Sequence, residues 1–497
     1  MHNMRKVAVG SLGLVVLCTL ALLASGKPFA KLPSMAPLLP DMADELTAAS
    51  TSSAGPAVFL NDYEHDPVAA AKATKVESLP GLDGPLPAPA YAGYVTVDKE
   101  YNSNLFYWFF EKDGGMEPDT PIILWLQGGP GGTSMFGLFV ESGPYGLYQN
   151  LTIFEREYSW TKFAGMLYVD NPVMTGFSFT DSPDGISRNQ DEVADNLYAF
   201  FVSFYKAYPQ YKNNPLIIAA ESYGGKYAPA ITYKIMTENA NSSNPNPPMP
   251  LKGMAVGDGL SDPATQILGY ADLAYNFGIA DPAEAATMRE YQKNILHNIE
   301  TKNWPLASKL FNDLVDGPPD LFQNYSGSPN YFDVRISYTP VYGGDFSAFL
   351  NRSDVRAALH VGDHYFLDGS VAAEGLQDDL CKTVKPLMPT IFNNLDVLIY
   401  NGQFDYIVGA PLTENMLALF GPEWHGWRTW LDQPKVIWRL APSDQHVAGY
   451  VKQFDSTSST TFTQIVVRDA GHISPWDQPQ VISQMYQNFA YGLPFKP

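Results

Sequence analysis

Short, largely apolar runs recur along the chain and alternate with stretches of helical periodicity. Each run has the length of a strand, and continuous apolar character is typical of strands buried on both faces of a parallel sheet. The runs lie at residues 121–126, 165–170, 216–220, 252–257, 395–400 and 463–467. Between them, Val193, Leu197, Phe200 and Phe204 stand at helical spacing within residues 191–208. Strands that alternate with helices predict a doubly wound, mostly parallel α/β sheet.

Two parts of the chain interrupt this rhythm. Residues 27–90 have no steady period and contain Pro-rich and Ser/Thr/Ala-rich stretches, so we expect an extended, partly ordered N-terminal segment, with removal as a propeptide left open. From about 262 to 389, helical stretches mix with loop-like sequence. The sequence therefore predicts one globular domain over 91–497, with a largely helical cap at about 262–389 inserted between two core strands.

The first 26 residues have the layout of a secretory signal peptide. Arg5 and Lys6 precede an apolar run at 7–24, and small residues close the run, so we expect cleavage near Gly26. An uncleaved anchor helix is the alternative, because the run is almost long enough to span a bilayer. The small residues favour cleavage, which predicts a protein of the secretory pathway, secreted or lysosomal/vacuolar.

Cysteine and sequon positions follow from that pathway. Cys18 lies in the signal, so Cys381 is the only cysteine of the mature chain, and no disulfide can form within it. The expected glycan acceptors are Asn150, Asn241, Asn324 and Asn351, each in an Asn-x-Ser/Thr site.

The net charge of −21 limits the partners. Lys plus Arg number 31 against 52 Asp plus Glu, so the protein should repel phosphate backbones and anionic membrane surfaces. We therefore expect no nucleic-acid partner. No later apolar run matches the first, so we also expect no stable membrane insertion after signal cleavage.

The strongest chemical signal is a strand that runs into a tight turn bearing a serine. Ala220-x-Ser222-x-Gly224 follows an apolar run and precedes a helix, like a nucleophile elbow with Ala in place of its first Gly. The small residues avoid collisions in the turn, which pushes the Ser222 hydroxyl out at the strand's carboxyl end. Most such strings are ordinary turns, so the interpretation depends on partners elsewhere in the chain.

An activated serine needs a base and a residue that orients the base. Asp405 follows the run at 395–400, and His472 follows the run at 463–467. The order Ser, Asp, His is that of α/β-hydrolases, and the inserted cap accounts for the long separation of the first two. The sequence predicts Ser222 as nucleophile, His472 as base and Asp405 as its orienter.

Two further motifs have competing interpretations. Gln127-Gly-Gly-Pro-Gly-Gly follows a strand and can cradle a phosphate or bring backbone N–H groups to a reacting carbonyl. No Gly-Lys-Ser/Thr follows and the chain is acidic, which favours the oxyanion role. His360 and His364 stand four residues apart, but Val361 replaces the Glu of zinc peptidases. We therefore expect neither a metal nor another cofactor.

Together these strings resemble the serine carboxypeptidase family. The shared strings are Tyr91-Ala-Gly-Tyr-Val, Leu124-Trp-Leu-Gln-Gly-Gly-Pro-Gly, Glu141-Ser-Gly-Pro, Ala220-Glu-Ser-Tyr-Gly-Gly-Lys-Tyr, Gly257-Asp-Gly-Leu-Ser-Asp-Pro and Ala470-Gly-His-Ile. Gln127 and Met135-Phe-Gly-Leu-Phe-Val-Glu resemble the vitellogenic carboxypeptidase-like branch. The resemblance implies an α/β-hydrolase fold and release of single amino acids from peptide or protein C-termini through an acyl-enzyme on Ser222, with a homodimer left open.

The resemblance also implies roles for residues around the triad. The N–H groups of Gly129 and Tyr223 are the expected oxyanion donors. The expected binding residues for the substrate's terminal carboxylate are Gln127, Gly128, Glu141 and Glu221. Two Glu and a substrate carboxylate cannot all be charged in a water-free pocket, so one Glu should keep a proton and activity should be highest at acid pH.

The chain departs from the family pattern at four positions. Gln127 stands where most relatives have Asn, Gly132 replaces a Cys, and Thr161 and Gly165 replace Asn residues. None of these changes removes a member of the predicted triad.

Two other functions stay open at this point. One is an esterase or acyltransferase that uses the same triad, and the other is a catalytically silent secreted protein that binds or stores a ligand. Retention of Glu141 and Glu221, which serve a substrate ending in a carboxylate, argues against the first. Retention of the triad argues against the second.

Overall fold

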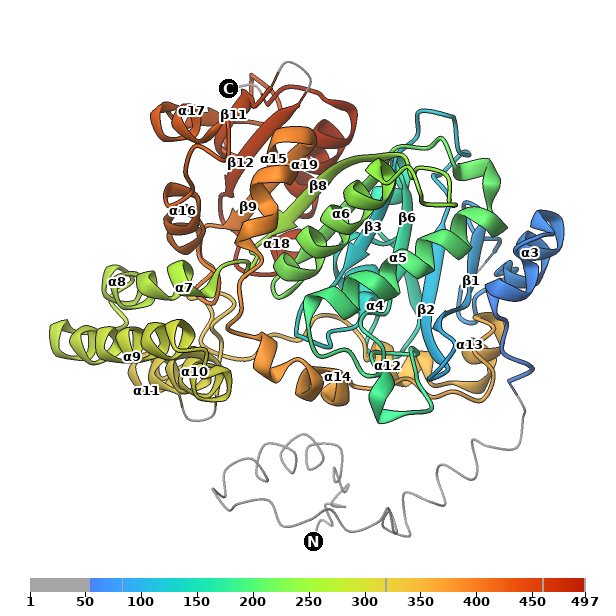
Figure 1. Cartoon of the computed structure of the whole chain (residues 1–497), viewed down its shortest axis with the longest axis horizontal. Coiled ribbons are helices and arrows are strands. Elements are labelled where there is room, and N and C mark those ends of the chain that lie inside the picture. Colours follow the sequence, from blue (N-terminus) through green and yellow to red (C-terminus); the bar gives the residue numbers. More distant parts are fainter. Residues whose placement is uncertain (1–53, 83, 318–319, 458–459, 496–497) are drawn as a thin grey trace, which may run out of the picture.

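A ten-stranded sheet forms the centre of the molecule (Figure 1). The computed structural model describes residues 54–82, 84–317, 320–457 and 460–495, so the expected signal peptide at 1–26 lies outside it. The strands are β1 (Ala90–Asp98), β2 (Ser103–Phe110), β3 (Ile122–Leu126), β6 (Gly165–Val169), β7 (Leu216–Glu221), β8 (Leu251–Gly257), β9 (Asp396–Gly402), β10 (Val436–Trp438), β11 (Gly449–Asp455) and β12 (Thr461–Val467), and a separate hairpin pairs β4 (Tyr145–Leu147) with β5 (Ile153–Glu155).

The strand order is β1-β2-β6-β3-β7-β8-β9-β12-β11-β10. Pairing is parallel from β6 through β12, and it is antiparallel at both edges, where β1 and β2 and then β11 and β10 are added. The apolar runs of the sequence form the parallel strands, so the predicted mostly parallel α/β sheet is confirmed.

Helices cover both faces of the sheet (Figure 1). They are α3 (Pro67–Thr74), α4 (Ser134–Phe136), α5 (Gln190–Ala207), α6 (Gly224–Ala240), α7 (Pro263–Gln266), α8 (Tyr270–Asn276), α9 (Pro282–Glu300), α10 (Trp304–Phe311), α11 (Leu321–Ser326), α12 (Phe346–Leu350), α13 (Ser353–Ala358), α14 (Ser370–Gly375), α15 (Met388–Asn394), α16 (Ala410–Ala418), α17 (Trp427–Asp432), α18 (Ser474–Asp477) and α19 (Pro479–Tyr491). None of the described helices combines the length and apolar character needed to cross a bilayer.

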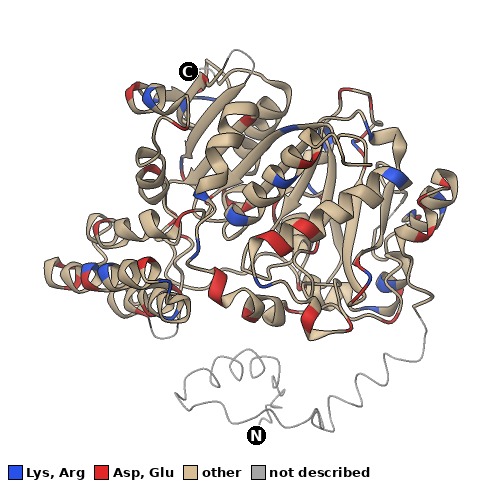
Figure 2. Ribbon diagram, in the orientation of Figure 1, with Lys and Arg blue, Asp and Glu red and all other residues tan. Residues whose placement is uncertain are grey.

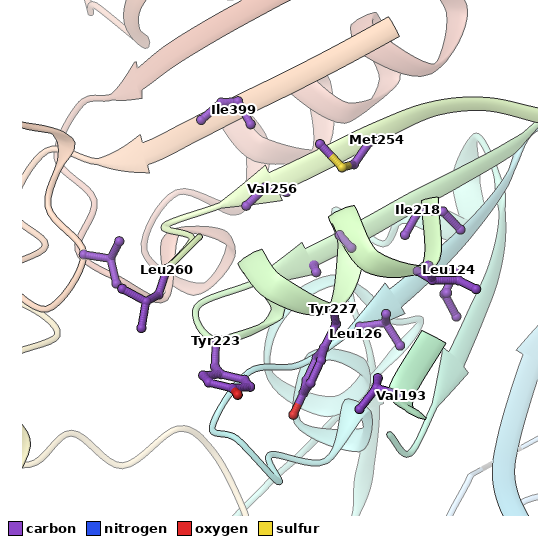
Figure 3. Close-up of a cluster of buried hydrophobic side chains, with 14 of the residues drawn as sticks. Leu124, Leu126, Val193, Ile218, Tyr223, Tyr227, Met254, Val256, Leu260 and Ile399 are labelled. Carbon is purple, nitrogen blue, oxygen red and sulfur yellow. The ribbon is translucent and has the colours of Figure 1, made fainter. Parts of the chain in front are cut away.

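Side chains of the central strands alternate between two apolar cores because successive residues point to opposite faces. Leu124 and Ile218 pack in the core that includes Val193 of α5, which Figure 3 shows. Trp125 packs in the other core with Met485 of α19. Charged residues lie mostly on surface helices and loops, and few lie along the central strands (Figure 2).

The segment between β8 and β9 contains helices α7 to α15, with α8 to α11 at one end of the molecule (Figure 1). Of the N-terminal segment 27–90, the described part starts at residue 54 and includes α3, which packs beside β1. Pro67 at the first turn and an Asp66 side chain that accepts from Ala69 N–H start this helix. The described part of this segment therefore contains a short helix that packs against the edge of the sheet.

A buried ion pair joins the segment between β8 and β9, called the inserted segment below, to α6. Lys226 Nζ lies 3.2 Å from Asp379 Oδ2, and both side chains are almost fully buried. The same oxygen accepts hydrogen bonds from the Tyr223 hydroxyl and the Gln190 amide, each at 2.7 Å. Burial lowers the pKa of Lys226 and the charge of Asp379 opposes that shift.

Asp379→Ala should therefore destabilise the protein by about 3–5 kcal/mol, because it leaves the Lys226 ammonium buried without its counter-charge. Chemical unfolding followed by fluorescence measures the loss. Asp313→Ala, which breaks the exposed Lys309–Asp313 pair, is the matched control and should shift the midpoint little. Equal effects of the two substitutions would contradict this role for the buried pair.

Candidate active site

Ser222 stands at the carboxyl end of β7, in the turn before α6. Its φ of 63° is in the left-handed region that non-glycine residues rarely adopt. Gly225 N–H donates to the Ser222 carbonyl at 2.9 Å, and Ser222 N–H donates to the Gly257 carbonyl at 3.1 Å. Gly128 faces this turn so closely that a Cβ there would lie 2.6 Å from the Ser222 Cβ. The predicted strand, turn and helix are all present.

His472 and Asp405 form a buried pair. His472 Nδ1 lies 2.8 Å from Asp405 Oδ2, and both side chains are at most 1% exposed. Asp405 also accepts from Val408 N–H at 3.2 Å. His472 Nε2 is buried and makes no hydrogen bond within the described chain. It lines the same cavity as Ser222.

Burial shifts both partners of this pair. It lowers the pKa of His472 to about 4 and raises the pKa of Asp405 to about 8, because a charge on either group is poorly solvated. The N–H groups of Ile407 and Val408 oppose the shift of Asp405. When the Asp405–His472 pair carries charges, these donors stabilise the negative charge on the Asp405 carboxylate.

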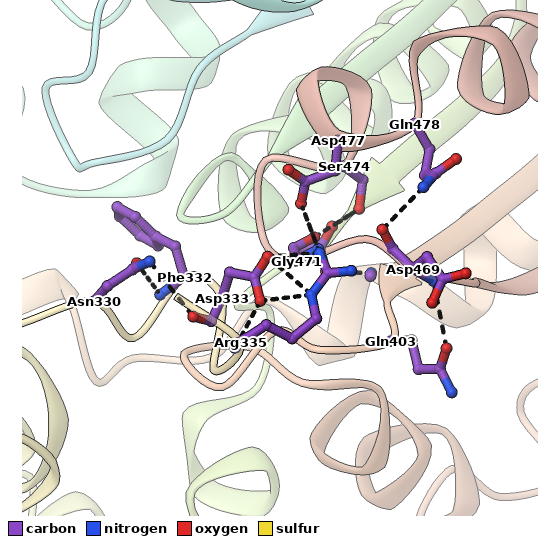
Figure 4. A network of polar contacts seen from close by, with 12 residues as sticks. Asn330, Phe332, Asp333, Arg335, Gln403, Asp469, Gly471, Ser474, Asp477 and Gln478 are labelled. Atoms are coloured by element: carbon purple, nitrogen blue, oxygen red, sulfur yellow. Dashed lines mark hydrogen bonds and ion pairs between the residues drawn. The ribbon is translucent and has the colours of Figure 1, made fainter. Parts of the chain in front are cut away.

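The segment that carries His472 is held by the inserted segment (Figure 4). His472 N–H donates to the Phe332 carbonyl at 2.7 Å, and the two rings stack at 4.9 Å. Arg335 binds Asp333 and reaches Asp477 at 3.6 Å, and Asp477 in turn accepts from Gly471 N–H. The orientation of the imidazole therefore depends on residues far away in sequence.

Gly129 and Tyr223, whose N–H groups are the predicted oxyanion donors, line the same cavity as Ser222. Gly129 and Tyr223 donate to no acceptor in the described chain. Gly129 has a φ of 114°, and a Cβ there would lie 2.5 Å from Gly132 N, so the loop requires glycine. A Cβ at Gly132 would lie 2.8 Å from the Gly128 carbonyl oxygen, so in this loop a side chain there would be crowded.

A cluster of one amide and two carboxyl groups borders the same cavity. Gln127 Nε2 donates to Glu221 at 3.1 Å and to Glu141 at 3.3 Å, while its oxygen accepts from Trp125 Nε1 at 2.9 Å. Arg156 donates to the Glu141 carbonyl at 2.9 Å and so fixes the turn that carries this residue. Gln127 and Glu221 line the cavity, and Glu141 lies behind them.

Neither glutamate is in an ordinary carboxylate environment. Burial raises the pKa of Glu141 to about 8, opposed by the Gln127 hydrogen bond. Burial also raises the pKa of Glu221 far above its usual range, and the charge of Glu141 raises it further. Two buried carboxyl groups this close cannot both be ionised, so the pair shares at least one proton at acid pH.

The cavity has a volume of about 330 Å³ and a largely apolar lining. The apolar and aromatic lining residues include Phe136, Leu260, Phe311, Tyr331, Tyr342, Phe346, Leu380, Ile407 and Ile473. Ser222, His472, Gly128, Gly129 and Tyr223 lie in its lining, whereas Asp405 stands behind His472.

The other sequence candidates lie apart from this cavity. His360 bonds to the Lys75 carbonyl and His364 stacks on Phe179, so these two do not form a site together. Of the sequons, Asn150, Asn241 and Asn324 are exposed, whereas Asn351 is half-buried and accepts from Phe366 N–H.

The sequence analysis assigns no role to Asp258, although this residue lies in one of the strings that resemble the serine carboxypeptidase family, Gly257-Asp-Gly-Leu-Ser-Asp-Pro. Asp258 directly follows strand β8 and lies beside Asp405 and His472, with ligand-type atoms of the three within 4.8 Å of one another. This is the one described group of three side chains that could hold a metal ion, and its atoms are fully buried. A carboxylate just past an apolar strand, the signal that identified Asp405, could also have identified Asp258.

Comparison with known proteins gives concordant matches. A family model described as serine carboxypeptidase matches residues 80–492. The chain is 46% identical over 465 residues to a probable serine carboxypeptidase CPVL of Dictyostelium discoideum, covering 91% of each. It is 34% identical over 409 residues to the vitellogenic carboxypeptidase of Aedes aegypti, covering 81% of this chain and 83% of that protein.

Among solved structures, the prohormone-processing carboxypeptidase Kex1 of Saccharomyces cerevisiae matches with a TM-score of 0.69 at 21% identity, over 85% of this chain and 96% of that one. This likeness confirms the predicted α/β-hydrolase fold. With its motifs matched from residue 80 to 492, the chain belongs to the serine carboxypeptidase family and is a hydrolase of peptide substrates.

Proposed function

We propose that this carboxypeptidase releases single amino acids from peptide C-termini through an acyl-enzyme on Ser222, with highest activity at acid pH. The observation that carries the proposal is the Gln127–Glu141–Glu221 cluster beside the cavity that Ser222 and His472 line. A cluster of this chemistry can hold one terminal carboxylate while the preceding carbonyl lies at the serine.

In the acylation step, His472 Nε2 takes the proton of the Ser222 hydroxyl as the oxygen attacks the carbonyl carbon. The N–H groups of Gly129 and Tyr223 bind the oxyanion that forms. Asp405 holds the Nδ1 proton and stabilises the imidazolium. His472 then gives its proton to the leaving amino group, and a water repeats the sequence to release the shortened peptide.

The proton of the glutamate pair explains how an acidic subsite binds an anion. A protonated carboxyl can donate a hydrogen bond to the substrate carboxylate, and so can the Gln127 amide. When the pair loses that proton, the subsite repels the substrate. This recognition favours a peptidase over an esterase or acyltransferase, because those substrates need not end in a carboxylate.

The signal-like N-terminus and the exposed sequons support a protein of the secretory pathway, secreted or lysosomal/vacuolar. Of the four sequons, Asn150, Asn241 and Asn324 are the proposed acceptors because their side chains are exposed.

Ser222→Ala should lower turnover by at least about 10³-fold, because only the oxyanion donors and substrate binding remain. Fluorophosphonate labelling should disappear with the activity. Ser242→Ala, at an exposed position, is the matched control and should keep both. Labelling that persists at another serine would contradict the proposal that Ser222 is the nucleophile.

Asp405→Asn should cost up to about 10⁴-fold in turnover, because the amide favours the wrong tautomer of His472. Asp396→Asn, at the start of the same strand, is the control and should stay active, since the Asp396 side chain accepts from Thr461 N–H and does not line the cavity. Near-full activity of Asp405→Asn would show that the base is oriented by another group.

The Michaelis constant for peptides with a free C-terminus should rise about fourfold between pH 5.5 and 8.5, because Glu141, with a pKa of about 8, ionises at the upper end of that interval. Below about pH 4, His472 becomes protonated and the turnover number should fall. Steady-state kinetics across this range give an optimum on the acid side of neutrality.

Two comparisons isolate the subsite. A peptide amidated at its C-terminus should escape the rise in the Michaelis constant, and Glu141→Gln should reduce it. Glu155→Gln, at an exposed position, should leave the pH dependence unchanged. If free and amidated peptides show the same dependence, the two glutamates do not bind the substrate carboxylate.

A further inference from the structure

Asp258 is a buried carboxyl group that the mechanism above does not use. It follows β8 with a φ of 46°, in the left-handed region, and its side chain is 0% exposed. Asp and Asn are among the residues that tolerate this conformation. Asp258 is thus held in an uncommon conformation immediately behind the proposed triad.

The Asp258 turn contacts all three segments that carry the triad. Asp258 Oδ1 accepts from Gly402 N–H at 2.8 Å, three residues before Asp405, and Oδ2 accepts from the Ser474 hydroxyl at 3.2 Å, two residues after His472. On the third side, Gly257 and Leu260 form backbone hydrogen bonds with Ser222 at 3.1 and 3.0 Å. One turn therefore joins the ends of strands β7, β9 and β12.

The two carboxyl groups compete for one negative charge. Asp405 receives the imidazole N–H and the Val408 N–H, which lies within reach of both carboxylate oxygens, whereas Asp258 receives one N–H and one hydroxyl. Of these donors only the imidazole can itself become positively charged, so Asp405 ionises first and Asp258 keeps its proton. Consistently, burial and the charge of Asp405 raise the pKa of Asp258 far above its usual range.

The surroundings of Asp258 favour that neutral form. The titratable groups that interact with it are Asp405, His472, Glu221, Tyr400 and Tyr486. No Lys or Arg of the described chain forms an ion pair with it. A second negative charge there would face two carboxyl groups and only one cationic candidate.

We propose that Asp258 is a positioning residue, whose protonated carboxyl donates a hydrogen bond to the Asp405 carboxylate and fixes it against His472 Nδ1. The proposal rests on the roles of Asp405 and His472 proposed above. The donated hydrogen bond stabilises ionised Asp405, so it opposes the burial that raises the pKa of this carboxyl group. Asp258 itself does not line the cavity that Ser222 and His472 share.

The test compares two substitutions on an amidated or ester substrate, which removes the contribution of Glu141 and Glu221. Asp258→Ala should lower kcat/KM about 10-fold to 100-fold at pH 5, because a hydrogen bond to a charged group is lost. The acid limb of the kcat/KM–pH profile of this variant should move to higher pH by about one unit, since Asp405 ionises less readily. Asp258→Asn, whose amide can still donate, should restore most of the rate and return the acid limb to the wild-type position.

Folding and function are separated by two further measurements and two further variants. Thermal unfolding and fluorophosphonate titration give the folded and active fractions of each variant. Asp258→Gly, which tolerates positive φ, supplies a second donor-free variant if Asp258→Ala does not accumulate. Asp396→Asn is the matched acid-to-amide control and should match the wild type.

The outcomes distinguish this proposal from the one on which it rests. An acid limb that shifts in the Ala or Gly variant and returns in the Asn variant supports the positioning role. Unshifted acid limbs in all variants, with Asp405→Asn still inactive, would overturn the role of Asp258 and leave the triad intact. Activity in Asp405→Asn would instead overturn the triad itself.

Discussion

Burial of carboxyl groups without basic partners is the constraint on which this active site depends. Glu141, Glu221 and Asp258 are almost fully buried, and none forms an ion pair with Lys or Arg of the described chain. In such surroundings a carboxyl group is stable mainly as the neutral acid or as an anion with several N–H donors. The site contains both neutral carboxyl groups and a carboxylate, and the hydrogen-bond donors around each group determine which form it takes.

The sheet creates this arrangement because parallel strands end at one edge. Strands β7, β8, β9 and β12 bring Ser222, Asp258, Asp405 and His472 to that edge from positions up to 250 residues apart. The segment inserted after β8 then covers the edge, with Phe332 against the imidazole and Asp379 tied to Lys226. Exclusion of water by this cover is what makes the carboxyl groups unusual acids.

The sequence predicted those parts of the fold that depend on local pattern. Strand β3, and strand β7 up to Ala220, are apolar because both faces of the sheet are covered, and the triad was predicted because each member follows such an apolar run. Helix α3 was missed because eight residues with three consecutive alanines carry little periodicity, and its start depends on one cap. Asp258 was missed because its role depends on the distance to Asp405, which belongs to a strand about 140 residues later and only becomes its neighbour through the pairing of β8 with β9.

In the proposed mechanism, neutral carboxyl groups act as hydrogen-bond donors in both the substrate subsite and the triad, so both need protons. The proposed subsite needs a proton on the glutamate pair to bind the substrate carboxylate, and the proposed role of Asp258 needs one to support Asp405. His472 works in the opposite direction, since a base must be unprotonated, and burial lowers its pKa to about 4. The same removal of water therefore holds protons on the carboxyl groups and off the imidazole, so one physical cause supplies both the acids and the base of the proposed mechanism.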